Sequence, residues 1–134
     1  MFLLDSKLKK DSFLVGELEI CQLRLNNDER FPWLILIPQI PNLRDLHDIP
    51  EQQQQAVLAE INHCSSVLSD LVKADKMNVA ALGNLVPQLH IHVIARKTND
   101  IAWPQPVWSS GTPEAYGNAE KSRTINQITQ AMKL

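Results

Sequence analysis

Apolar positions along the chain follow two different periods, and the first predicts β-strands. Partial alternation of apolar and polar residues over 13–25 indicates two short, half-buried strands. The run 33–37 is apolar throughout and is bounded by Pro32 and Pro38, which is typical of a strand buried on both faces. Two further strands are expected over 77–82 and 89–95.

Between the third and fourth predicted strands, the apolar positions recur at spacings of three and four. This period predicts an amphipathic helix of roughly 20 residues, which we expect to start with Asp48 as its cap, Pro50 in its first turn and Glu51 completing a capping box. A closing helix is expected over 119–132. The order of elements predicts an α+β fold: an antiparallel sheet of about five strands, one long helix packed on it and a C-terminal helix.

Length and composition predict one soluble globular domain. The chain has 134 residues, of which 44% are hydrophobic and 21% charged. We expect a single domain over 1–134, with a motif-bearing core over about 13–96 and an irregular segment rich in Pro and Trp over 97–134. The formal net charge of −2 does not favour a surface for duplex nucleic acid.

Cysteine content and hydropathy predict a cytoplasmic location and no membrane partner. Cys21 and Cys64 are the only two cysteines and do not form a CxxC pair, which favours a reducing compartment. No apolar run approaches the ~20 residues that cross a bilayer, and no signal peptide is recognisable. The basic cluster over 7–10, flanked by Asp5 and Asp11, is expected to be a solvated segment.

The candidate chemistry lies on the last predicted strand. Because strand side chains alternate, Gln88, His90 and His92 are expected on one face. A neutral imidazole can attack phosphorus through one nitrogen while the other nitrogen keeps its proton. A second imidazole or an amide can stabilise charge on the phosphoryl oxygens. This face therefore predicts phosphate chemistry.

The same segment resembles the signature of the histidine triad (HIT) superfamily, which reads His-φ-His-φ-His-φ-φ, where φ is apolar. Gln88 stands at the first His position, so the chain resembles a divergent branch with Gln-x-His-x-His. The resemblance implies that His90 is the nucleophile that forms a covalent nucleotidyl-histidine. It implies that His92 contacts the substrate phosphate, with Gln88 as the third catalytic position.

The similarity extends to positions outside this motif. It implies three substrate-binding residues: Asn84, which follows Gly83 ahead of the motif; Asn78; and Asn27. The chain also departs from the pattern. Trp33 replaces a His that orients the nucleophile, and Leu85 stands where many members have a Ser or Thr that bonds the leaving group.

The resemblance implies a nucleotide hydrolase or nucleotidyl transferase that acts at the α-phosphate, with dinucleoside polyphosphates or nucleoside phosphoramidates as plausible substrates. It also implies a homodimer, and we expect neither a cofactor nor a metal. Two alternatives stay open. The first is a nucleotide-binding protein with little catalysis, because Trp33, Leu85 and Gln88 each replace an assisting group. The second is a metal-dependent hydrolase using His90 and His92, which would need a third ligand for zinc.

Overall fold

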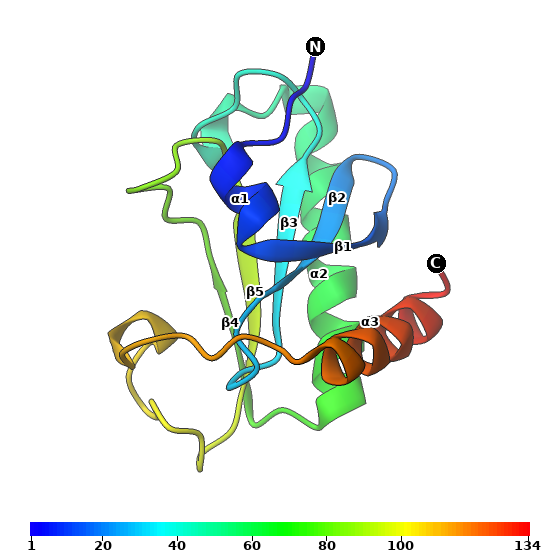
Figure 1. Cartoon of the computed structure of the whole chain (residues 1–134). Coiled ribbons are helices and arrows are strands. Elements are labelled where there is room, and N and C mark those ends of the chain that lie inside the picture. Colours follow the sequence, from blue (N-terminus) through cyan, green and yellow to red (C-terminus); the bar gives the residue numbers. More distant parts are fainter.

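The structure, a computed structural model, describes all 134 residues. Its centre is a five-stranded antiparallel sheet in the order β1-β2-β3-β5-β4 (Figure 1). The strands are β1 Ser12–Glu17, β2 Cys21–Asn26, β3 Trp33–Pro38, β4 Lys76–Ala80 and β5 Ile91–Arg96. The helices are α1 Ser6–Lys10, α2 Glu51–Val72 and α3 Asn118–Met132, with short 3-10 helices η1 Leu46–Asp48 and η2 Val107–Ser109. The predicted α+β fold is confirmed.

The alternation of side chains along β3 divides the molecule into two layers of core. Leu34 and Leu36 belong to the larger cluster of 18 buried residues, to which α2 and α3 also contribute. Trp33, Ile35 and Ile37 belong to a cluster of 8 on the opposite face. We call these the helix face and the site face of the sheet. Both faces are apolar, which explains why every residue of β3 is buried.

The start of α2 differs from the prediction. The helix begins at Glu51, directly after Pro50, and no side chain caps it. The carboxylate of Asp48 instead accepts the backbone N–H groups of Arg44 at 3.2 Å and Asp45 at 2.9 Å. The predicted capping box was therefore wrong, because Ile49 and Pro50 are extended and separate Asp48 from the first turn of α2.

The site face carries irregular segments from both ends of the chain. The basic cluster over 7–10, expected to be merely solvated, lies in α1, which Asp5 caps by accepting the N–H groups of Lys7 and Leu8. Leu8 is buried in the site-face cluster. From the C-terminal side, Glu29 donates its N–H to the Glu114 carbonyl at 2.7 Å. None of the helices combines the length and apolar character that crossing a membrane requires.

Candidate active site

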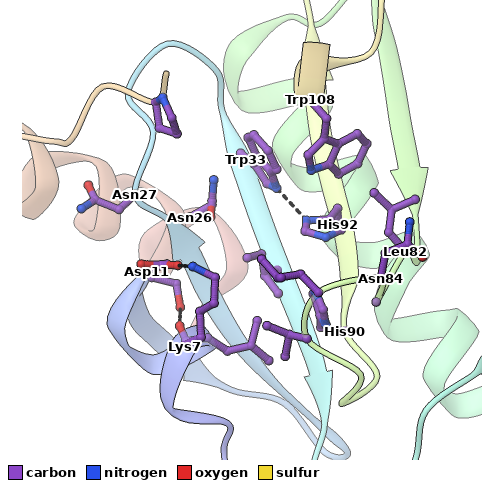
Figure 2. A pocket seen from close by; sticks show the side chains of 17 residues that line it. Lys7, Asp11, Asn26, Asn27, Trp33, Leu82, Asn84, His90, His92 and Trp108 are labelled. Carbon is purple, nitrogen blue, oxygen red and sulfur yellow. Dashed lines mark hydrogen bonds and ion pairs between the residues drawn. The ribbon is translucent and has the colours of Figure 1, made fainter. Parts of the chain in front are cut away.

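A cavity of about 650 Å³ opens on the site face between α1, the ends of β2 and β3, the loop before β5, and η2 (Figure 2). His90, His92, Asn84 and Asn27 line it. The wall also includes Lys7, Leu8, Asp11, Trp33, Ile35 and Trp108. The cavity therefore collects residues that are far apart in the sequence, and its size suits a small-molecule ligand.

His90 has one defined tautomer. It lies one residue before β5, so the strand starts two residues later than predicted. Its Nδ1 is 2.7 Å from the backbone carbonyl of Gln88. A carbonyl oxygen can only accept a hydrogen bond, so Nδ1 carries the proton and Nε2 has a free lone pair. The ring is thus held in the form that a nucleophile needs.

His92 has the opposite tautomer, which its neighbour Trp33 determines. The indole Nε1 of Trp33 lies 2.9 Å from Nδ1 of His92 (Figure 2). An indole N–H only donates, so Nδ1 of His92 accepts and the proton of the neutral ring is on Nε2. Burial, with a smaller effect of His90, lowers the pKa of His92 to about 4. His92 is therefore a neutral donor at pH 7.

The Nε2 atoms of both rings are open to the cavity. Every buried side-chain nitrogen and oxygen has a hydrogen-bond partner. Nε2 of His90 and Nε2 of His92 have no hydrogen-bond partner in the protein. These two atoms are therefore not buried, and solvent or a ligand can reach them. The ring centroids of His90 and His92 are 4.9 Å apart and their planes are inclined by 72°. One lone pair and one N–H thus face the same space, an arrangement that suits attack on a phosphorus whose oxygens need a donor.

Gln88 does not line this cavity. Its Oε1 accepts the backbone N–H of Asp5 and its Nε2 donates to the carbonyl of Leu3, both at 2.8 Å. Alternation along a strand predicted that Gln88 would share a face with the two histidines, but β5 begins only at Ile91. The side chain of Gln88 therefore binds the N-terminal segment, and its backbone carbonyl accepts the hydrogen bond from His90.

The three predicted asparagines fall in different places. Asn84 is an exposed residue of the cavity wall, after Gly83, whose φ of +71° suits glycine. Asn27 also lines the cavity, but its Oδ1 accepts the N–H of Tyr116 at 2.9 Å, so its amide NH₂ is the free group. Asn78 lies outside the cavity.

Asn78 is part of a network around Arg96. Its Oδ1 accepts from Nη1 of Arg96 at 2.9 Å. Arg96 is fully buried, and its Nε donates to Asp100 at 2.7 Å. The guanidinium also lies over the ring of Trp103, 5.5 Å from its centroid. This network ties the segment after β5 to the sheet, with no part of it in the cavity.

Aromatic and charged groups outside the histidine motif complete the site. Trp108 lies against His92, with ring centroids 5.0 Å apart, and against Trp33 at 5.5 Å. Lys7 and Asp11 form an ion pair of 2.7 Å in the cavity wall. Oppositely charged residues four positions apart are typical of a helix. Here α1 is too short for the sequence pattern to predict it.

The donor set does not favour a metal held by His90 and His92. The one group of three side chains close enough to share a metal ion is Asp45, His47 and Asp48, which is exposed. In the cavity, Nε2 of His92 carries the ring proton and so has no lone pair for a metal, and the only carboxylate of the wall, Asp11, is paired with Lys7. A third ligand for the two histidines is therefore missing from the geometry.

Comparison with known proteins shows the family of this chain. The family model of the HIT domain matches residues 7–99 of the chain. The chain belongs to the HIT family. The match begins at α1, ahead of the core at 13–96 that the sequence motifs indicated. None of the curated proteins matches the chain.

Three crystal structures of HIT proteins are similar over nearly the whole length. The histidine triad protein from Bradyrhizobium japonicum is 40% identical, with a TM-score of 0.94 and coverage of 98% of both chains. The one from Sinorhizobium meliloti is 39% identical, with a TM-score of 0.95 and coverage of 98% and 97%. The one from Marinobacter aquaeolei is 39% identical, with a TM-score of 0.96 and coverage of 99% and 97%. These structures thus cover nearly the whole chain, including the irregular segments of the site face.

Proposed function

We propose that this HIT protein is a nucleotide hydrolase or nucleotidyl transferase in which His90 forms a covalent intermediate. The observation that carries the proposal is the free Nε2 lone pair of His90, fixed by the bond from Nδ1 to Gln88 and open to the cavity. The family supports it at the level of fold, which in HIT proteins serves nucleotide binding and nucleotide hydrolysis or transfer. A protein of the same fold from Sulfolobus tokodaii, 19% identical, is named a hypothetical histidine triad nucleotide-binding protein.

The proposed reaction has two displacements at the α-phosphorus. Nε2 of His90 donates its lone pair to phosphorus, and the bond from phosphorus to the leaving group breaks with its electron pair on the leaving group. Nδ1 keeps its proton throughout and donates it in the hydrogen bond to the Gln88 carbonyl. Water or another acceptor then attacks phosphorus and gives its proton to solvent, while the phosphorus–nitrogen bond breaks and its electron pair returns to Nε2 of His90. The Nε2–H of His92 and the amide of Asn84 stabilise the phosphoryl oxygens.

Trapping the intermediate tests the proposal. The protein would be mixed with a nucleotide labelled at the α-phosphate, either a dinucleoside polyphosphate or a nucleoside phosphoramidate, and quenched in alkaline denaturant, where a phosphorus–nitrogen bond to His survives. We expect label on the protein and none on His90→Ala. His63→Ala is the matched control, because His63 is exposed on α2. Turnover by the wild type without protein-bound label would refute the covalent route.

A nucleotide-binding protein with little catalysis is the second candidate, and the state of His92 favours it. A leaving group takes a negative charge as it departs, and protonation by a nearby acid assists it. His92 is neutral because its pKa is about 4, and Gln88 is outside the cavity. The side chain after Asn84 is Leu85, which cannot donate a hydrogen bond. Tight binding of a nucleotide without turnover of any tested substrate would select this candidate.

We further propose a homodimer through β4 and α2. β4 is an end strand of the sheet, so its outer edge has unpaired backbone groups. Beside this edge, Leu58 is 55% exposed and Val79 is 48% exposed, and both line an apolar groove of about 370 Å³. A second copy related by a two-fold axis would pair this edge with itself and cover the groove.

Light scattering checks the dimer. We expect Leu58→Glu to shift the mass from dimer to monomer. Leu14→Glu is the control, since Leu14 is 51% exposed on β1 at the other end of the sheet. A monomeric wild type would contradict the proposal. Cytoplasmic location stays a prediction, which the two free thiols of Cys21 and Cys64 support.

A further inference from the structure

The N-terminal helix α1 forms one wall of the cavity and is packed against the rest of the protein. Leu8 is 6% exposed and packs in the same cluster as Trp33 and Ile35. The segment before α1 is held by both polar atoms of the Gln88 side chain, at residues 3 and 5. Contacts on both sides thus fix α1 against the catalytic segment. The backbone of α1 therefore has a defined position beside the cavity, and the Lys7 and Asp11 side chains, 52% and 48% exposed, extend from it.

α1 and the turn after it present a cation and an anion to the cavity. Lys7 and Asp11 are the only Lys, Arg, Asp or Glu residues among those that line it. Nζ of Lys7 lies 2.7 Å from Oδ2 of Asp11, while Oδ1 of Asp11 accepts no hydrogen bond. Figure 2 shows the pair beside Asn26 and Asn27, at the opposite end of the cavity from His90, His92 and Asn84.

The charge of Asp11 determines which part of a substrate it faces. A phosphate at neutral pH has only acceptors and is repelled by a carboxylate, so Asp11 faces a part that bears N–H or O–H donors. A nucleotide whose α-phosphorus lies at His90 puts its base, and not its ribose, farthest from the phosphorus. In such a placement the Lys7–Asp11 pair would meet the polar edge of the base, and the apolar side chains of Leu8 and Ile35 belong to the same cavity wall.

We propose that the Lys7–Asp11 pair reads the nucleobase and selects guanine; this rests on the proposed nucleotide chemistry at His90. Guanine offers two adjacent N–H groups to a carboxylate, and its O6 and N7 accept from a lysine. Oδ1 of Asp11 is free to accept, and the ammonium of Lys7 has two N–H groups left after its bond to Oδ2. Adenine presents an acceptor at the position where guanine has its ring N–H, so it leaves the carboxylate with fewer donors.

The test compares bases and variants by the dissociation constants of the four ribonucleoside 5′-monophosphates, measured by titration calorimetry. We expect wild type to bind the guanine nucleotide about tenfold more tightly than the adenine nucleotide, as one charged hydrogen bond predicts. Asp11→Asn and Lys7→Met should each remove most of this preference. Lys10→Met is the control, because Lys10 is exposed on α1 and does not line the cavity.

Two outcomes would overturn the inference while the proposed function stands: wild type binding nucleotides without preferring guanine, or an unchanged preference in both variants. Parallel titrations with 2′-deoxy nucleotides separate the base from the sugar. If Asp11→Asn changed only the discrimination between ribose and deoxyribose, Asp11 would read the sugar and the inference would be wrong. Failure of all four nucleotides to bind wild type would refute the proposed function together with the inference.

Discussion

The two faces of the sheet are covered in different ways. The helix face is packed by α2 and α3, which supply regular apolar side chains to a cluster of 18 buried residues. The site face is covered by α1, η2 and extended segments from both ends of the chain, and its cluster has 8 buried residues. Irregular segments leave a cavity where helices would fill the space. One face therefore supplies most of the buried core, and the other leaves room for a ligand next to His90 and His92.

The largest effect that separates the faces is expected at His90. His90→Ala removes the lone pair that faces the cavity, and we expect the rate of nucleotide turnover to fall by more than about ten-thousandfold, beyond what loss of one acid or base causes. The dissociation constant for a nucleoside monophosphate should change by less than about threefold, because the other walls are intact. Steady-state kinetics and calorimetry on the same protein measure both. A variant that kept a tenth of the turnover would show that His90 is not the nucleophile.

Neighbouring residues of β3 allow a direct comparison of stability. Leu36 is fully buried on the helix face, and Leu36→Ala should lower the free energy of unfolding by about 2–5 kcal/mol, since it leaves an empty space. Ile35 lines the cavity on the site face, so Ile35→Ala opens space that water can fill and should cost less. Urea denaturation of both variants measures the difference. Equal losses would mean that the two faces contribute alike.

Acid should destabilise the protein through His92. Its pKa is about 4 in the folded protein and about 6.5 when exposed, so between these values the unfolded chain binds the extra proton. The stabilisation is present above pH 6.5 and is lost as the pH falls to 4, by at most about 3 kcal/mol. His92→Gln should flatten the stability profile in this window. Unfolding curves from pH 4 to 7 check it, and an unchanged slope in the variant would assign the effect to other groups.

The smallest expected effect concerns the attachment of the N-terminal segment. Gln88→Leu removes two hydrogen bonds and should lower the free energy of unfolding by about 1–3 kcal/mol. Hydrogen exchange should become faster at residues 3–11, and KM should rise more than kcat falls. Gln88→Glu keeps the acceptor for Asp5 and should lie in between. If Gln88→Leu lowered kcat with KM unchanged, Gln88 would act on the reaction itself and not through α1.

Local patterns predicted the strands and α2 because each element is specified by its own side-chain period. They also predicted His90 and His92 on one face, and both residues line the same cavity because they are close in the sequence. The same alternation placed Gln88 on the face of the two histidines, and this was wrong because Gln88 precedes the strand. At the start of α2, the capping pattern around Asp48 matched the sequence but not the backbone, because extended residues intervene.

The sequence by itself determined the order of elements, the two apolar faces and the pair of histidines. Only the tertiary structure decided the partners of these groups. Trp33 meets His92 across a separation of 59 residues, and Gln88 meets Asp5 across 83. Periodicity reports which face a side chain belongs to, but contacts between distant segments depend on how the loops close over that face. The tautomers of His90 and His92, the wall formed by α1 and the position of Trp108 follow from that closure.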